Sequence, residues 1–233
     1  YITTARKKAK FGLDLATARE VLVNGRQRYG NLSLDGIHIH IGSQITSAEP
    51  FIEALKKMSA FIADVRGQGA VIDYFDIGGG LGIIYSEEQP QTAAEFAARV
   101  LPMLESLDVK IILEPGRFIA GNAGILLTQV QYVKESYEKR FVIVDAAMND
   151  LIRPSLYSAF HRIEPVKLRD KRQEARSKKA DVVGPVCESG DFLGKDRELD
   201  VDAGEYLAVM SAGAYGFAMS SNYNSRRRAA EVM

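Results

Sequence analysis

Apolar positions in the first half of the chain alternate between helical and strand spacing. Apolar residues recur every three or four positions in segments 14–29, 50–65 and 92–104, which predicts three amphipathic helices. Asp14 is placed to cap the first helix, and Thr92 with Glu95 has the pattern of a capping box. Short apolar runs at 35–41, 71–77 and 109–113 predict strands between and after these helices.

The pattern changes at about residue 122. Further strands are predicted at 125–133, 141–145, 181–187 and 205–210, with a single short helix near 152–160. Strand–helix alternation in the first half favours parallel strands with right-handed crossovers, in a sheet or a barrel. The second half favours a mostly antiparallel β domain. We therefore predict an α/β domain over residues 1–122 and a β domain over residues 123–233.

Composition narrows the function classes. The 233 residues contain 30 Lys+Arg and 30 Asp+Glu, so the net charge is zero and we expect no nucleic-acid partner. No apolar run reaches the roughly 18–20 residues of a membrane span, so we expect no membrane association. The single cysteine, Cys187, cannot form an intrachain disulfide, and we expect a cytoplasmic protein. The basic run 167–179 is interpreted as an exposed loop or hairpin.

Candidate chemistry gathers where the first-half strands end. His40 leads into Gly42 and Ser43, the glycines 78–80 follow the next strand, and residues 114–117 (Glu-Pro-Gly-Arg) follow the third. In a (β/α) barrel the active site is built at this carboxyl-terminal rim. The polar strand ends therefore predict a site there.

The residue types at this rim suit an anionic ligand. A run of glycines lets backbone N–H groups approach a phosphate, and the Ser43 hydroxyl adds a donor. The spacing matches neither the dinucleotide nor the P-loop pattern. Glu114 and Arg117 form either an ion pair or a functional pair, in which Glu114 faces a cationic heterocycle nitrogen and Arg117 binds an anion. His40 is either a core histidine or a catalytic one.

The second half adds candidates for substrate binding. Arg153 and Tyr157 are four residues apart, so on a helix they share a face and could bind a carboxylate. Cys187 and Glu188 place a thiol beside a carboxylate in a glycine-containing loop. Tyr215 is surrounded by small residues, which suits either a ligand pocket or a packed turn. We expect no metal site.

Taken together, these segments resemble the barrel-fold, pyridoxal-phosphate-dependent amino-acid decarboxylases, and within that family most closely those acting on meso-diaminopimelate. The matching segments, in family order, are 10–14, 36–44, 76–82, 114–119, 144–157, 182–194 and 213–226. The resemblance implies that residues 1–122 form the later part of a TIM-type barrel. It implies that residues 123–233 form a β domain with substrate and dimer contacts.

The resemblance also implies roles for individual residues. His40 would stack on the cofactor ring, and Glu114 would face its pyridinium nitrogen. Cys187 would protonate the carbon left by departing carbon dioxide, in the active site of the neighbouring subunit of a homodimer. The other implied cofactor contacts are Ser43, Gly78, Gly79, Gly80, Pro115, Gly116, Arg117 and Tyr215. The implied substrate contacts are Arg117, Arg153, Tyr157, Glu188 and Tyr215.

The implied reaction is decarboxylation of meso-diaminopimelate to L-lysine. Arg153 would bind the distal carboxylate and Glu188 the distal amine, whereas ornithine or arginine offers no distal carboxylate. The alternatives are a related decarboxylase acting on ornithine, arginine or carboxynorspermidine, and a non-catalytic relative that acts as a binding partner. The family's cofactor-bearing lysine has no counterpart here, since Lys7, Lys8 and Lys10 match another segment. We therefore expect a partial sequence of a longer decarboxylase.

Overall fold

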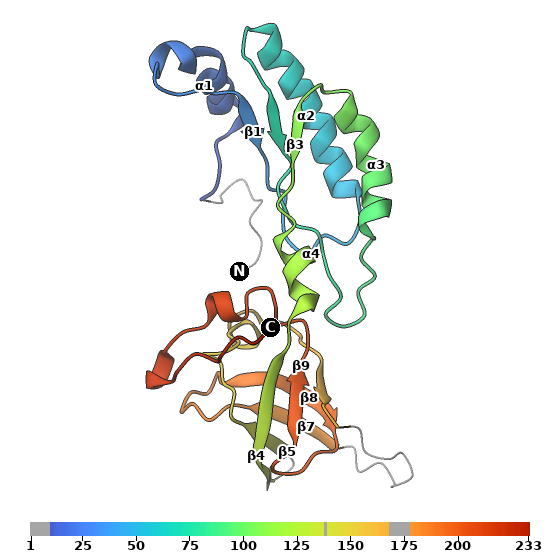
Figure 1. The fold of residues 1–233 in the computed structure, drawn as a ribbon, viewed down its shortest axis with the longest axis vertical. Helices are drawn as coiled ribbons and strands as arrows, with labels where there is room; N and C mark the ends of the chain where they lie inside the picture. The colour runs from blue at the N-terminus through green and yellow to red at the C-terminus, as the bar shows by residue number, and fades with distance from the viewer. Residues whose placement is uncertain (1–9, 138, 168–177) are drawn as a thin grey trace. The chain divides into compact units, whose positions relative to one another are not determined.

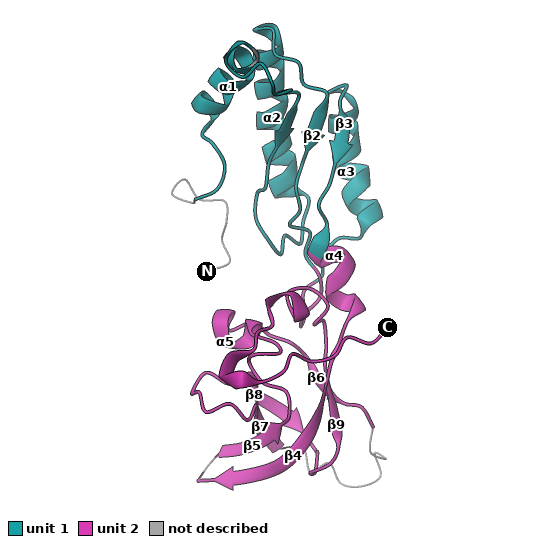
Figure 2. Ribbon diagram, turned by 60° about the vertical axis from the view of Figure 1, so that its left-hand side comes forward, with its two compact units in different colours: residues 1–82, 89–116 teal, residues 83–88, 117–233 magenta. Residues whose placement is uncertain are grey.

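A computed structural model describes residues 10–137, 139–167 and 178–233 of the chain. Most of the predicted basic loop 167–179, together with Lys7 and Lys8, lies outside the described residues. The chain divides into two compact units (Figure 2). Unit 1 comprises residues 1–82 and 89–116, and unit 2 comprises residues 83–88 and 117–233. The short segment 83–88 thus packs with the second half of the chain.

Unit 1 is a three-stranded parallel sheet with connecting helices (Figure 1). Its strands are β1 (Gly36–His38), β2 (Tyr74–Asp76) and β3 (Lys110–Ile112), and β2 lies in the middle. Helix α2 (Glu49–Gly67) connects β1 to β2, and helix α3 (Ala93–Glu105) connects β2 to β3. Helix α1 (Leu15–Arg28) precedes them. The predicted helix–strand alternation is confirmed, but each strand is shorter than predicted.

The helix ends follow from local side-chain chemistry. The Asp14 carboxylate accepts from the backbone N–H groups of Ala16 and Thr17, which α1 would otherwise leave unpaired. Thr92 and Glu95 form the predicted capping box of α3, and Pro50 lies in the first turn of α2.

The apolar stripes of α2 and α3 form the core of unit 1. Phe51 of α2 packs edge-to-face on Phe96 of α3, with ring centroids 4.9 Å apart. Phe75, the central residue of β2, is fully buried. The stripe predicted for α1 is wrong at its first position, because Leu15 remains 56% exposed while Leu22 is buried.

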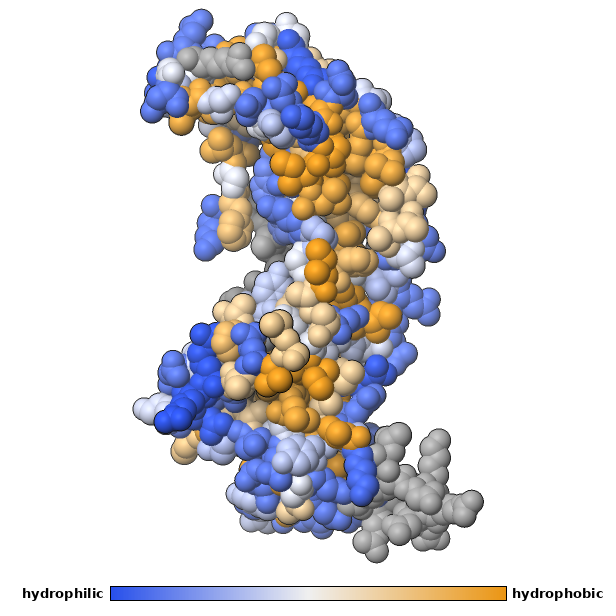
Figure 3. Space-filling model, viewed as in Figure 1, coloured by the Kyte–Doolittle hydropathy of each residue, from blue (hydrophilic) through white to orange (hydrophobic). Residues whose placement is uncertain are grey.

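The two faces of the unit 1 sheet differ in burial. Side chains alternate across a strand, so the neighbours of the buried Phe75 point to the opposite face. On that face Tyr74 and Ile112 are 37% and 43% exposed. Figure 3 shows apolar residues on the surface of this unit. The central strand is therefore more deeply buried on the Phe75 face than on the opposite face.

Unit 2 is built on a six-stranded mixed sheet of order β6-β9-β4-β5-β7-β8. The strands are β4 (Leu126–Ser136), β5 (Lys139–Val144), β6 (Ile163–Pro165), β7 (Lys178–Val183), β8 (Phe192–Leu199) and β9 (Tyr206–Val209). Four of its five strand pairings are antiparallel, and β5 pairs with β7 in parallel. The mostly antiparallel prediction is confirmed, although β6 and β8 were not predicted.

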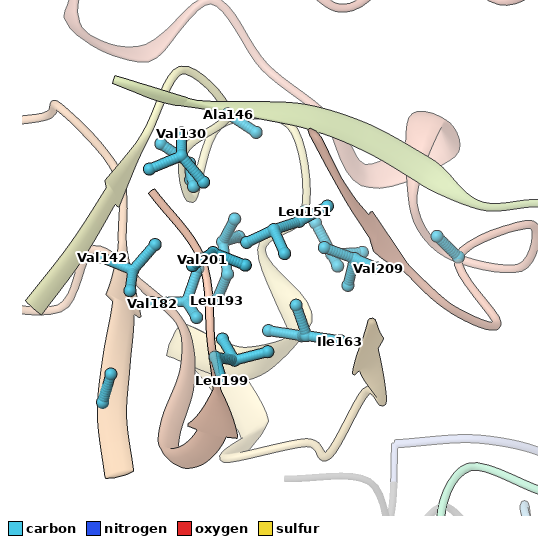
Figure 4. Packing of buried hydrophobic residues seen from close by; sticks show 14 residues of the cluster. Val130, Val142, Ala146, Leu151, Ile163, Val182, Leu193, Leu199, Val201 and Val209 are labelled. Atoms are coloured by element: carbon cyan, nitrogen blue, oxygen red, sulfur yellow. The ribbon is translucent and has the colours of Figure 1, made fainter. Parts of the chain in front are cut away.

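The inward side chains of this sheet form one core (Figure 4). Val142, Val182, Leu193, Leu207 and Val209 are fully buried within it. Burying one such side chain stabilises the folded state by about 1.5–3 kcal/mol. The packed sheet therefore holds in place the strand ends from which the loops of unit 2 extend.

Short helices interrupt the strands of unit 2. Helix α4 (Gly116–Ala120) leads into β4, with the 3-10 turn Gly121–Ala123 between them. Helix α5 (Arg153–Tyr157) occupies part of the predicted 152–160 helix. It ends early because Ser158 adopts a left-handed conformation at φ +53°. Within the described residues, no helix is long and apolar enough to cross a membrane.

Candidate functional site

The three strands of unit 1 end in backbone segments that touch one another. A Cβ atom on Gly78 would overlap the carbonyl oxygen of Ile39, and one on Gly79 would overlap that of Glu114. Gly80, at φ +102°, would meet the carbonyl of Gly42. The glycines thus allow close approach of the three strand ends. The sequence predicts that these glycines bind an anion, and the close packing of the strand ends is a second reason for a glycine at each of the three positions.

Three polar side chains converge at these strand ends. His38 Nε2 lies 3.4 Å from Glu114 Oε2, and both side chains are about half exposed. Asp76 Oδ1 accepts from the backbone N–H of Gly78 at 2.8 Å. Ligand atoms of His38, Asp76 and Glu114 lie within 4.8 Å of one another, a spacing that could also hold a metal ion. The expected absence of a metal stays a prediction.

The other predicted residues of unit 1 lie along the same strand ends. His40 is exposed and Ser43 is half-buried on the segment after β1. Pro115 and Gly116 follow Glu114, and the Glu114 N–H donates to the Gly78 carbonyl at 2.9 Å. The structure therefore gathers His40, the glycines and Glu114 at one edge of the sheet, together with His38 and Asp76. The last two were not among the predicted site residues.

In unit 2, the predicted substrate residue Arg153 is buried against the ring of Tyr85. Its side chain is 5% exposed, and its guanidinium lies 4.5 Å from the ring centroid of Tyr85. Arg153 forms no ion pair with a described carboxylate, and Arg117 is a nearby like charge. Burial therefore lowers the pKa of Arg153, and the charge of Arg117 adds to that shift.

Arg117 reaches the same aromatic group. Its Nη1 donates to the Tyr85 hydroxyl at 2.5 Å, and its guanidinium lies 4.8 Å from the ring of Tyr215. The guanidinium groups of Arg117 and Arg153 thus both contact Tyr85, and that of Arg117 also contacts the ring of Tyr215. Such a concentration of positive charge suits an anionic ligand. Tyr157, predicted to share a face with Arg153, lies one turn along α5 and is half-buried.

His161 completes this cluster and was not predicted. It is fully buried, and Nδ1 lies 2.9 Å from the carbonyl oxygen of Met210. Nε2 lies 2.7 Å from Arg153 Nη1, and the ring packs edge-on against Tyr85 at 5.2 Å. Burial lowers the pKa of His161 to about 4, helped by the positive charges of Arg153, Arg197 and Arg117.

The Cys187–Glu188 loop lies between β7 and β8. Cys187 and Glu188 are exposed, and Glu188 accepts a hydrogen bond from the Tyr223 hydroxyl at 3.3 Å. The buried Asp191 anchors the loop by accepting from the backbone N–H groups of Met148 at 2.6 Å and Val186 at 2.8 Å. Burial raises the pKa of Asp191 and the two hydrogen bonds oppose that shift. The thiol is thus presented to solvent on a fixed loop.

Neither Tyr85 nor His161 was among the predicted site residues, and each omission has a physical reason. Tyr85 belongs to segment 83–88, which lies inside the first half but packs with unit 2. His161 precedes the three-residue strand β6, too short for a clear periodic pattern. The only signal for His161 in the sequence was its place two positions before Ile163, which puts a polar residue on the same side of the chain as a buried one.

Comparison with known proteins places the chain beside decarboxylases that use pyridoxal phosphate. Residues 21–213 match the family described as pyridoxal-dependent decarboxylase, C-terminal sheet domain. A diaminopimelate decarboxylase of Aquifex aeolicus is 52% identical over the whole chain, which covers 55% of that relative. The chain thus spans about half the length of the curated relatives it matches.

Solved structures show the same likeness. The crystal structure of the Helicobacter pylori diaminopimelate decarboxylase complexed with L-lysine is 41% identical and superposes with a TM-score of 0.89. The match covers 98% of this chain and 56% of that one. A lysine/ornithine decarboxylase of Vibrio vulnificus, at 23% identity and a TM-score of 0.85, shares the fold. The chain therefore belongs to the pyridoxal-dependent decarboxylase family.

Proposed function

We propose that this chain supplies the cofactor-holding and substrate-holding residues of an enzyme that decarboxylates meso-2,6-diaminopimelate to L-lysine and carbon dioxide. The observation that carries the proposal is the buried Arg153, which contacts His161 and the Tyr85 ring but forms no ion pair with a described carboxylate. A buried cation of this kind is stabilised when a ligand carboxylate reaches it. Diaminopimelate has a carboxylate at its distal end, whereas ornithine and arginine have only cationic groups there.

The residues at the strand ends of unit 1 fit pyridoxal phosphate. Glu114 presents an exposed carboxylate beside Asp76 and His38, which suits a pyridinium N–H. The glycines leave no side chain between the strand ends. We assign ring stacking to His40, the ring nitrogen to Glu114, and further cofactor contacts to Ser43, Gly78–Gly80, Pro115, Gly116, Arg117 and Tyr215.

The chain's own residues would bind and orient the substrate and return a proton to it. Arg153 and Tyr157 would bind the distal carboxylate, Glu188 the distal amine, and Arg117 and Tyr215 would make further contacts. Pyridoxal phosphate, when bound, supplies the electron sink for the pair left behind by carbon dioxide. The Cys187 thiol would deliver a proton to the carbon that lost its carboxylate. An exposed thiol on an anchored loop suits that role.

We further propose that unit 1 is part of a TIM-type barrel, with the β domain beginning near residue 123. The support is the parallel sheet of unit 1, with one face covered by helices and Tyr74 and Ile112 exposed on the other. In a barrel these side chains would face the interior. We also propose a homodimer, in which the exposed Cys187–Glu188 loop enters the partner's active site.

A chimera tests the proposed function. In the Aquifex aeolicus relative, the region that matches this chain is replaced by it, and turnover of meso-diaminopimelate, ornithine, arginine and carboxynorspermidine is compared. We expect turnover of diaminopimelate alone. Cys187→Ser should reduce that turnover at least tenfold, while Glu198→Gln, an exposed position on β8, should not change it. A folded chimera that binds the cofactor but does not act on diaminopimelate would contradict the proposal.

A further inference from the structure

His161 is a buried titratable group that the proposed reaction does not use. It is the only buried one of the chain's three histidines, all of which lie in the described residues. Its ring contacts three groups: the Met210 carbonyl, the Arg153 guanidinium and the Tyr85 ring. Each of these contacts restricts the orientation of the imidazole.

The partners determine the tautomer of His161. Nδ1 faces a carbonyl oxygen, which can only accept, so Nδ1 carries the hydrogen. Nε2 faces a guanidinium N–H, which can only donate, so Nε2 carries none. The imidazole is therefore neutral and presents one lone pair to Arg153.

This lone pair orients the guanidinium. The Arg153 guanidinium lies over the Tyr85 ring, 4.5 Å from its centroid, and this cation–π contact leaves the direction of the individual N–H groups free. The hydrogen bond from Nη1 to His161 Nε2 removes that freedom. Because the acceptor is neutral, it leaves the positive charge of Arg153 available, whereas a carboxylate would neutralise it.

We propose that His161, as its Nδ1–H tautomer, is a positioning residue that aims Arg153 at the distal carboxylate of the ligand. The inference rests on the proposed function for the identity of the ligand and on the hydrogen bonds alone for the positioning. Selectivity for a ligand with a distal carboxylate thus depends on a histidine that need not touch the ligand.

The tautomer and the orientation can be measured on the full 233-residue chain. Long-range ¹H–¹⁵N NMR spectra distinguish protonated from unprotonated imidazole nitrogens, and His161→Gln identifies the signal. We expect unprotonated Nε2 and slow exchange of the Arg153 Nη protons, identified with Arg153→Lys. A protonated Nε2 at neutral pH would overturn the proposal.

Two matched variants separate positioning from packing. In His161→Gln the amide oxygen can accept from Arg153, whereas in His161→Asn the amide nitrogen can donate to Met210 but nothing reaches Arg153. Both variants remove the ring. We expect slow Arg153 exchange to persist in His161→Gln and to be lost in His161→Asn. Equal behaviour of the two variants would indicate a purely structural role and overturn the proposal.

Ligand binding completes the test. The probes are meso-diaminopimelate and D-lysine, measured by calorimetry on the same three proteins. D-lysine keeps the carboxylate of the reacting centre and lacks the distal one, which the product L-lysine retains. We expect at least tenfold preference for diaminopimelate in the wild type and His161→Gln, and near-equal binding in His161→Asn. A wild type with the expected NMR signals but no preference would overturn the ligand assignment and the proposed function, while the positioning of Arg153 would stand.

Discussion

Gly79 and Glu114 touch through their backbones, although 35 positions separate them and they follow different strands. A Cβ atom on Gly79 would overlap the Glu114 carbonyl oxygen, which belongs to the residue assigned to the cofactor nitrogen. Glu114 is also held by the hydrogen bond from its N–H to the Gly78 carbonyl. The position of this carboxylate therefore depends on the absence of a side chain at residue 79.

Gly79→Ala should destabilise unit 1 by about 1–3 kcal/mol, the usual cost of overpacking a rigid site. The matched control is Gly67→Ala at the end of α2, where an added Cβ meets nothing within 4 Å. That variant should be neutral or stabilising by up to about 1 kcal/mol. Urea unfolding of both variants provides the comparison. A Gly79→Ala protein as stable as wild type would show that the strand ends can separate without cost.

The stability of unit 2 should depend on pH through His161. Its pKa falls from 6.5 to about 4 on folding, so between these values the unfolded chain binds a proton that the folded chain does not. The contribution of the neutral His161 to the free energy of unfolding is complete above pH 6.5. It decreases as pH falls towards 4, by about 3 kcal/mol in total.

The measurement is the free energy of unfolding at several pH values, for wild type and His161→Gln. The difference between the two proteins should decrease as pH falls through this range, since Gln does not titrate. A difference that is constant from pH 7 to pH 4 would contradict the assignment of a neutral His161.

Asp191→Asn should loosen the Cys187–Glu188 loop. Both carboxylate oxygens accept backbone N–H groups, and an amide can replace only one of these acceptors. One buried N–H would lose its partner, at a cost of about 1–3 kcal/mol. Glu198→Gln on the same sheet makes the same chemical change at an exposed position and serves as the control.

Two readouts check the Asp191 variant: thermal unfolding and the rate at which iodoacetamide alkylates Cys187. Thermal stability should fall. The alkylation rate of this already exposed thiol should change, because the loop that carries it is no longer fixed. If neither quantity changes, Asp191 does not anchor the loop.

The ring and the hydroxyl of Tyr85 should have separable effects. Tyr85→Phe keeps the surface on which Arg153 stacks but removes the acceptor of the Arg117 hydrogen bond. Tyr85→Leu removes both, including a cation–π contact of about 1–2 kcal/mol. We expect the Leu variant to lose the restricted Arg153 exchange in NMR spectra and the Phe variant to retain it. The reverse order would place the hydroxyl, not the ring, in control of Arg153.

The sequence by itself determined the helices of unit 1, the capping of α1 and α3 and the change of pattern between the two halves. These features depend on contacts within about four residues, so spacing and residue type are sufficient to predict them. The same local chemistry singled out the strand-end residues around Glu114 and the helix carrying Arg153. The family resemblance rested on long matching segments, which also need no tertiary information.

Only the tertiary structure decided which distant residues meet. The packing of segment 83–88 with unit 2 brings Tyr85 against Arg153, and the short strand β6 brings His161 beside them. Strands of three residues, such as β6, are stabilised by their neighbours in the sheet and carry too few side chains for a periodic signal. The orientation of the buried Arg153 depends on such long-range contacts, because its own neighbours along the helix include no carboxylate.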